Sequence, residues 1–241
     1  MEPLIEGKTA IVTGAATGIG EGIARLFAQE GARLVLLDRD SERNNAVARE
    51  LKAQAITCDV SDSFAVEQAV QEAGPADILI NNAGIYPRKS LIETTEQEWD
   101  HMQAVNLKSV FLLTKAMLPA MLERGSGKIV NISSVTFHLG TANLAHYVAS
   151  KGGVIGLTRT AAREAGPRNV HVNCITPGAI LVEAERAVQT EEALHEIMNQ
   201  QCLKRRLLPL DIARTCLFLA SALSDGLTGQ TLNVDGGWVM H

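Results

Sequence analysis

The feature that most constrains the fold is a regular alternation between short apolar segments and longer segments with helical spacing. The short segments, such as AIVT, LVLL and KIVNI, are almost continuously apolar and rich in β-branched residues. Parallel strands covered on both faces have this composition, and the helical segments between them suit crossover connections. The pattern predicts an α/β fold: a doubly wound parallel β-sheet of about seven strands with helices on both faces.

Glycine and proline mark the breaks between these segments, and no break is followed by a long polar linker. We therefore expect residues 1–241 to form one domain. The expected strands are 9–13, 33–37, 54–58, 78–81, 128–133, 170–175 and 231–234. The expected helices are 19–29, 41–51, 64–72, 96–122, 147–165, 183–200 and 210–220.

Charge and composition argue against several kinds of partner. Lys and Arg number 22 against 27 Asp and Glu, and a net charge of −5 offers nucleic-acid phosphates no general attraction. No apolar run reaches the roughly 18 residues that cross a bilayer, and the N-terminal stretch does not resemble a secretory signal. We expect a cytoplasmic protein with no membrane partner. The four cysteines lack paired spacing and nearby histidines, which predicts buried or half-buried free thiols and no metal site.

The stretch TGAATGIG follows the first expected strand and leads into an amphipathic helix. Gly14, Gly18 and Gly20 permit unusual backbone angles and a close approach of the main chain to a pyrophosphate, and the helix N-terminus adds N–H donors. The spacing is GxxxGxG rather than the commoner GxGxxG, so a purely structural turn is the alternative. In this position after a strand, the turn predicts a phosphate-binding site.

Asp38 ends the second expected strand, 18 residues beyond Gly20. A carboxylate there would accept hydrogen bonds from adenosine ribose hydroxyls and would repel a 2'-phosphate. Thr17 in the glycine-rich turn is not basic, which also favours NAD over NADP, although the neighbouring Arg39 softens the preference. The alternative role for Asp38 is a helix N-cap.

Further motifs follow in order: Asp59 with Val60, then Asn81-Asn82-Ala83-Gly84, Asn106, Ser134, Tyr147 with Lys151, and Pro177-Gly178. Together with TGAATGIG, these motifs span nearly the whole chain. In this order they resemble the short-chain dehydrogenase/reductase family, specifically its shorter single-domain subgroup with a Rossmann-type sheet. The resemblance implies dinucleotide contacts from Gly14, Thr17, Gly18, Ile19, Gly20, Asp38, Asp59, Val60, Asn82, Ala83, Gly84, Tyr147, Lys151, Pro177, Gly178 and Ile180.

Tyr147 and Lys151 carry the expected chemistry. The chain has only two tyrosines, and this one stands four residues before a lysine, so both side chains share one helix face. A nearby ammonium is expected to lower the phenol pKa from its usual value near 10, which would make Tyr147 a general acid/base. The alternative is a solvent-facing tyrosine beside an unrelated surface lysine.

Ser134 and Asn106 complete the expected catalytic group. Ser134 lies thirteen residues before Tyr147 at the end of an expected strand, where its hydroxyl can bond a substrate oxygen, although Ser133 has the same chemistry. In the family, an Asn placed like Asn106 holds a water that relays protons to the lysine. A buried Asn satisfied by backbone is the competing interpretation.

The substrate side is less constrained by sequence. The family often has a threonine four residues after the Pro-Gly pair, where this chain has Val182. Residues 181–207 are expected to form a substrate lid. The candidate pocket residues are mainly apolar and suit a hydrophobic or aromatic alcohol or ketone better than a sugar. They are Tyr86, Val135, Phe137 and Leu144, with His138, Leu139 and Leu181 nearby.

The sequence therefore predicts an NAD-dependent oxidoreductase that moves a hydride between nicotinamide and a secondary alcohol or ketone. The resemblance is nearest to NAD-dependent secondary-alcohol dehydrogenases. One alternative is a 3-oxoacyl-(acyl-carrier-protein) reductase, for which Arg124 and Arg168 would receive the acidic carrier. An alternative of another class is a non-catalytic dinucleotide-binding regulator. A small molecule is thus the expected partner.

Small residues in the Tyr147 helix bear on assembly. Ala149, Gly152, Gly153 and Gly156 recur at helical spacing, although each Gly costs up to about 1 kcal/mol relative to Ala. A close helix approach would offset that cost. Family members pair this helix across subunits, so we expect a homotetramer; the alternative is that these residues pack against the chain's own sheet.

Overall fold

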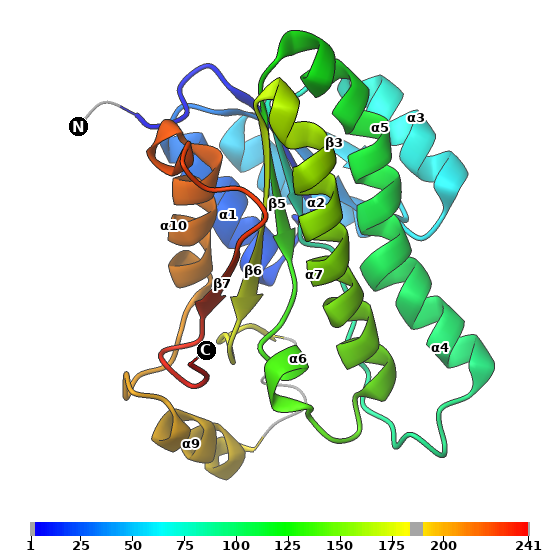
Figure 1. Cartoon of the computed structure of the whole chain (residues 1–241), viewed down its shortest axis with the longest axis vertical. Coiled ribbons are helices and arrows are strands. Elements are labelled where there is room, and N and C mark those ends of the chain that lie inside the picture. The colour runs from blue at the N-terminus through cyan, green and yellow to red at the C-terminus, as the bar shows by residue number, and fades with distance from the viewer. Residues whose placement is uncertain (1–2, 184–189, 241) are drawn as a thin grey trace.

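The computed structural model describes residues 3–183 and 190–240. Its centre is one sheet of seven parallel strands in the order β3-β2-β1-β4-β5-β6-β7 (Figure 1). The order reverses between β1 and β4, and ligands bind beyond the carboxyl ends of the strands at such a point. The strands are β1 Thr9–Thr13, β2 Arg33–Asp38, β3 Gln54–Thr57, β4 Ile78–Asn81, β5 Gly127–Ile132, β6 Val170–Pro177 and β7 Thr231–Val234.

Helices cover both faces of the sheet (Figure 1), because successive strand residues point to opposite sides. Val12 of β1 packs into the core cluster that includes Phe27 and Ile212, whereas its neighbour Ile11 packs into the cluster that includes Met117. One face is covered by α1 Gly18–Gln29, α2 Ser41–Leu51 and α10 Pro209–Ala220, and the other by α3 Ser63–Ala73, α5 Ser109–Arg124 and α7 Ala145–Ala165. The remaining α-helices are α4 Glu96–Gln103, α6 Thr136–Leu139 and α9 Glu191–Gln200.

The expected fold class is confirmed, and the strand boundaries differ from expectation by two residues at most. The expected helix over 96–122 is different in detail: α4 is joined to α5 by a π-helical turn, Ala104–Lys108. The single turn α6 was not expected. Of the expected helix over 183–200, the structure describes Glu183 and residues 190–200, where α9 begins at Glu191; residues 184–189, which also belong to the expected lid, lie outside the described part.

One helical run in the described part of the chain is long and apolar enough to cross a membrane by length and composition alone. The helical run Glu96–Arg124 has an 18-residue window of mean hydropathy 1.3, of which 44% is buried. Core helices pass the same test, and Leu113, Met117 and Met121 of this run face the second core cluster. Burial in the core accounts for the apolar composition of this run.

All four cysteines are free thiols, as expected. Cys58, Cys174 and Cys216 are buried, whereas Cys202 is exposed, contrary to expectation. It lies in the turn after α9, where the backbone bonds the C-terminal segment through Leu203 N–H and Gly236 C=O rather than entering the core. Within residues 3–183 and 190–240, no three His, Cys, Asp or Glu side chains form a group suited to a metal ion.

Candidate active site

The glycine-rich turn between β1 and α1 is closed too tightly for side chains. Gly14 and Gly18 have φ angles of +64° and +62°, which other residues rarely adopt. A Cβ on Gly14 would lie 2.9 Å from Ala83 Cα, and one on Gly20 would lie 2.0 Å from the Gly14 carbonyl oxygen. The sequence therefore needs glycine at these positions to form the turn.

This turn fits a negatively charged group. Thr17 is the N-cap of α1, yet its side chain makes no capping hydrogen bond to the first turn. The N–H groups at the start of a helix carry a partial positive charge and bind phosphate when nothing else caps them. Ile19 packs against the core beneath and fixes the helix start. These residues fit the pyrophosphate of a dinucleotide.

The Thr13 hydroxyl joins two strand ends, although no sequence motif singles this residue out. Thr13 Oγ1, at the end of β1, donates to the Ile80 carbonyl (3.3 Å) and accepts the backbone N–H groups of Asn82 and Ala83 (both 3.0 Å). Asn82 Nδ2 in turn donates to the carbonyls of Thr13 (2.9 Å) and Gly14 (3.1 Å). The turn after β4 is thereby fixed against the phosphate turn. The sequence feature that could have identified Thr13 is its position as the polar residue that ends an apolar strand.

Asp38 lies where the sequence placed it, at the end of β2 beside the phosphate turn. Its Oδ2 accepts the Ala16 N–H (3.0 Å) and its Oδ1 accepts the Asp40 N–H (2.9 Å). The N-cap of α2 is Asp40, which accepts the Arg43 N–H, so the alternative role of Asp38 as that cap is wrong. Its carboxylate is held at the turn as a fixed negative charge.

The third strand adds two further residues of the expected dinucleotide site. Val60 is buried, whereas Asp59 is exposed and accepts hydrogen bonds from the Ser61 hydroxyl (2.7 Å) and N–H (2.9 Å). These bonds favour the charged carboxylate and lower the pKa of Asp59.

Tyr147, Ser134 and Lys151 come together at the carboxyl ends of β5 and β6. The Tyr147 phenol is hydrogen-bonded to the Ser134 hydroxyl. Lys151, one turn along α7, places Nζ 5.7 Å from the centroid of the Tyr147 ring and donates to the Ile132 carbonyl at 2.8 Å. The side chains of a possible acid, a hydroxyl donor and a cation therefore share one site.

The structure distinguishes the two neighbouring serines. Ser133 Oγ donates to the Lys151 backbone carbonyl at 2.8 Å, so this hydroxyl ties α7 to the end of β5. Ser134 Oγ instead faces Tyr147 and accepts from the N–H and hydroxyl of Thr136 at 3.2 Å and 3.0 Å. Only Ser134 has its hydroxyl beside the phenol.

The expected lowering of the Tyr147 pKa is wrong for this structure. Burial raises the pKa of Tyr147 to about 12, and the bond with Ser134 only partly opposes that effect. Burial also lowers the pKa of Lys151 to about 8. The Lys151 ammonium donates to the Ile132 carbonyl and does not offset the burial of the phenol. At neutral pH the site therefore holds a protonated phenol.

Asn106 is fully buried in the π-helical turn between α4 and α5. Its Nδ2 donates to the Ile85 carbonyl (2.8 Å) and its Oδ1 accepts the Ile85 N–H (2.9 Å). The side chain thus matches the competing interpretation of an amide satisfied by backbone. It also borders the catalytic group, because a Cβ on Gly84 would lie 3.3 Å from Asn106 Oδ1 and 3.5 Å from Lys151 Nζ.

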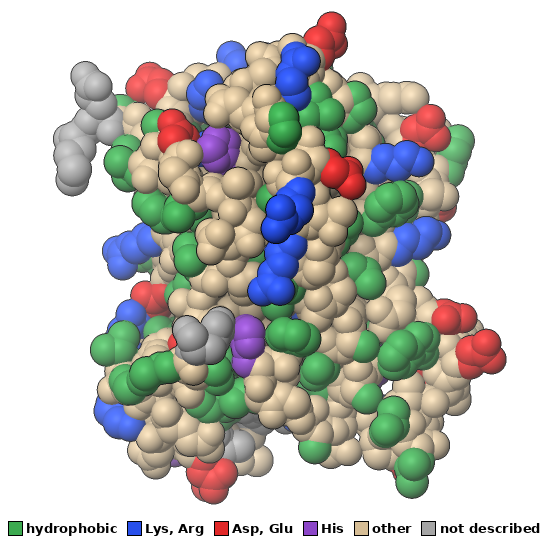
Figure 2. Space-filling model, viewed as in Figure 1, with side chains coloured by type: hydrophobic (Ala, Val, Ile, Leu, Met, Phe, Trp, Pro, Cys, Tyr) green, Lys and Arg blue, Asp and Glu red, His purple; other side chains and the backbone are tan. Residues whose placement is uncertain are grey.

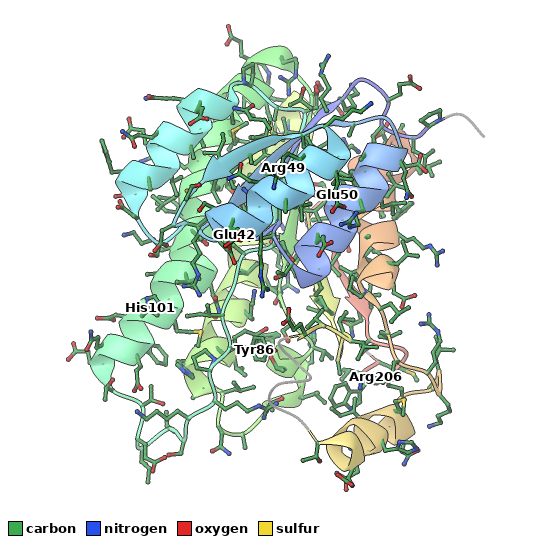
Figure 3. The ribbon with its side chains drawn as sticks, turned by 180° about the vertical axis from the view of Figure 1, so that it is seen from behind. Glu42, Arg49, Glu50, Tyr86, His101 and Arg206 are labelled. Carbon is green, nitrogen blue, oxygen red and sulfur yellow. The ribbon has the colours of Figure 1, made fainter. Side chains whose placement is uncertain are left out.

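The residues expected to face the substrate lie in different surroundings: some are buried and one is exposed. The Tyr86 ring meets the Tyr147 ring edge to face, with centroids 6.3 Å apart (Figure 3 labels Tyr86). Val135 and Leu144 are each 2% exposed, so both side chains are buried. Phe137 is 42% exposed and covers Gly152 of α7, where an added Cβ would lie 2.8 Å from its ring.

The Pro177-Gly178 segment at the end of β6 contacts the segment that follows β5. The Pro177 carbonyl accepts the Val135 N–H at 3.0 Å, and a Cβ on Gly178 would lie 2.8 Å from Asp235 Cα. Ile180 is buried and pairs with Leu207 in a parallel bridge. The end of β6 is thereby held beside the end of β5.

Comparison with known proteins agrees with this architecture. A family model described as enoyl-(acyl carrier protein) reductase matches residues 14–239. The D-xylose 1-dehydrogenase of Caulobacter vibrioides is 36% identical, over 98% of this chain and 97% of that protein. The 3-oxoacyl-(acyl-carrier-protein) reductase of Thermotoga maritima is 38% identical, over 98% and 99%. The crystal structure of a putative gluconate dehydrogenase from Agrobacterium tumefaciens superposes with a TM-score of 0.95 at 33% identity, and the match covers 100% of both chains.

Proposed function

Because the chain belongs to the short-chain dehydrogenase/reductase family, whose oxidoreductases use a nicotinamide dinucleotide, we propose that it is an NAD-dependent dehydrogenase or reductase of secondary alcohols and ketones. The observation that carries this proposal is the Tyr147 phenol, bonded to Ser134 and close to the Lys151 ammonium, at the end of the sheet that also holds the glycine-rich turn.

The proton chemistry follows from these side chains. Ser134 donates a hydrogen bond to the substrate oxygen and orients it beside the phenol. In ketone reduction, Tyr147 donates its proton to the oxygen as negative charge develops there. In alcohol oxidation, the phenol must first release its own proton to solvent, and the phenolate then accepts the hydroxyl proton. Lys151 contributes positive charge that stabilises the phenolate. When bound, the nicotinamide ring supplies or accepts the hydride.

NAD is the proposed cofactor, with NADP disfavoured. The glycine-rich turn and the uncapped start of α1 would hold the pyrophosphate, and Asp38 would accept the ribose hydroxyls. A 2'-phosphate at the same place would meet the fixed Asp38 carboxylate.

The proposed substrate is a hydrophobic or aromatic secondary alcohol or its ketone. Tyr86 and Phe137 contribute aromatic surface around Tyr147, backed by the buried Val135 and Leu144. A second candidate is a sugar, since full-length relatives at 36–37% identity are named D-xylose 1-dehydrogenase and probable galactose dehydrogenase.

The acyl-carrier alternative has less support from the basic side chains assigned to it. Arg124 donates to the Ala76 carbonyl at 2.8 Å and lies 3.7 Å from the Asp77 carboxylate, so it serves the chain's own loop. Arg168 reaches the Glu123 carbonyl at 3.5 Å. A non-catalytic regulator would have no need for the phenol, hydroxyl and ammonium in one cleft.

The test is a turnover screen with NAD(H) and NADP(H) against aromatic secondary alcohols, D-xylose and an acetoacetyl thioester. We expect turnover with NAD(H) on the aromatic compounds. Tyr147→Phe should lower the rate at least about 10²-fold, because it removes the proton donor. The matched control is Tyr86→Phe, which keeps the ring and should retain turnover. Undiminished activity in Tyr147→Phe would refute the proton donor, and no turnover by the unaltered enzyme with any pair would refute the oxidoreductase proposal.

A further inference from the structure

The segment after β6 reaches the dinucleotide site through described contacts. Ile180 pairs with Leu207, and Leu181 N–H donates to the Leu207 carbonyl at 2.8 Å. Val182 then packs on the phosphate turn, where a Cβ on Gly18 would lie 3.3 Å from Val182 Cγ1. These contacts fix the path of residues 180–182 and bring the next residue, Glu183, toward the start of α2.

Glu183 meets a basic side chain there. Its Oε2 lies 3.3 Å from Arg43 Nη1, and Arg43 Nε also lies 3.6 Å from Asp40 Oδ2. Asp40 is joined in turn to the ribose-binding candidate, because its N–H donates to Asp38 Oδ1 at 2.9 Å. A series of contacts thus connects Asp38 with Glu183 through the Asp40 backbone and the Arg43 side chain.

The chemistry of this series bears on the 2'-position of the adenosine ribose. A ribose diol is neutral, whereas a 2'-phosphate is anionic and is held by guanidinium groups. Arg43 is a guanidinium one helical turn from the end of β2, but it already has two carboxylate partners. Residues 38–43 and Glu183 together contain four carboxylates and only two guanidinium groups.

We propose that Glu183 is a cofactor-specificity residue: by pairing with Arg43 it withholds that guanidinium from a 2'-phosphate and adds a negative charge beside it, so that NAD is selected. The inference rests on the proposed NAD preference and extends it from Asp38 to the segment after β6. The sequence feature behind it is a glutamate that directly follows Val182, the position at which the family often has threonine.

Binding titrations test this without relying on turnover. NADH and NADPH dissociation constants are measured by cofactor fluorescence for the unaltered protein, Glu183→Gln, Arg43→Gln and the double variant. Glu183→Gln should tighten NADPH binding by about three- to fivefold and leave NADH binding within about twofold, the range of an exposed ion pair. In the Arg43→Gln background the same change should have a smaller effect, because there is no guanidinium to release. Added salt at about 0.5 M should reduce the difference.

Glu42→Gln is the matched control, since Glu42 lies next to Arg43 on α2 (Figure 3) and carries the same charge. An equal gain in NADPH affinity from Glu42→Gln, or an unchanged ratio in Glu183→Gln, would overturn the role of Glu183 while leaving the NAD preference intact. Tighter NADPH than NADH binding by the unaltered protein would instead overturn the NAD preference itself. A Glu183→Gln effect that persists fully without Arg43 would also contradict the pairing.

Discussion

Burial sets the protonation states of Tyr147 and Lys151, the two side chains proposed to carry the proton chemistry. Tyr147 and Lys151 were expected to share a helix face, and they do, but their pKa values move in directions that spacing alone does not reveal. Both pKa shifts come from desolvation, which depends on all the groups packed around the two side chains. Sequence therefore predicted which groups meet, whereas their resting charge required the structure.

The lowered pKa of Lys151 predicts how stability varies with pH. Its value is about 8 in the folded chain and 10.5 in the unfolded chain, so the unfolded chain binds more protons between those values. Stability from this group therefore rises with pH from about 8 to 10.5. From pH 7 to 9.5, the unaltered protein should gain about 1–2 kcal/mol relative to Lys151→Met. Urea unfolding at both pH values measures this, and an unchanged difference between the two proteins would contradict it. The raised Tyr147 pKa changes stability mainly above pH 10, so it contributes little to the change between pH 7 and 9.5.

Two elements at the site differ in how readily sequence reveals them. The glycine-rich turn was predictable because each of Gly14, Gly18 and Gly20 has its own steric reason to be glycine, and the spacing of the three glycines is visible in the sequence. The π-helical turn around Asn106 was not, because one extra residue per turn leaves the apolar pattern of a long helix almost unchanged. What fixes it is tertiary: the Asn106 amide must reach both backbone groups of Ile85.

The steric argument for the turn predicts the effect of one methyl group. Gly20→Ala places a Cβ 2.0 Å from the Gly14 carbonyl oxygen, so the turn must open. We expect a loss of about 1–3 kcal/mol in unfolding free energy. Dinucleotide affinity should fall roughly tenfold or more, because small displacements disrupt positioning.

Gly226→Ala is the control for that change, since an added Cβ there has nothing within 4 Å. Thermal unfolding and NADH titration of both variants measure the two effects. Near-normal NADH binding by Gly20→Ala would contradict the tight turn as the phosphate site.

At the scale of the whole molecule, sequence predicted the sheet well because its strands are apolar on both faces and its connections are short. Surfaces that pair between subunits are harder to recognise from the sequence. Of the small residues in α7, Gly152 and Gly153 are explained within the chain, because added Cβ atoms would meet Phe137 and Leu107. Gly156 has no such neighbour and is exposed, and Phe111 on the adjacent α5 is 46% exposed. Figure 2 shows hydrophobic side chains scattered over the side of the molecule where α5 and α7 lie (Figure 1).

We therefore predict that α7 pairs across a subunit interface in a homotetramer. Sedimentation equilibrium should give about four times the chain mass of 25.8 kDa. Gly156→Leu should reduce the assembled mass, because the added side chain fits the isolated chain but not a close helix pair. Gly226→Leu, on a different surface, should not. A wild-type mass equal to one chain would exclude the assembly, and an unaltered mass in Gly156→Leu would exclude this helix from it.

The hydroxyl of Thr13 has a consequence for how such an enzyme diversifies. It ties the end of β1, where the proposed phosphate site begins, to the backbone of the turn after β4, and so fixes the distance from that site to the proposed proton donor. Tyr86 packs against the Tyr147 ring, and Phe137 covers Gly152 of α7. New substrates can therefore be accommodated by exchanging the outer aromatic side chains, while the reach from one end of the bound dinucleotide to the other is conserved.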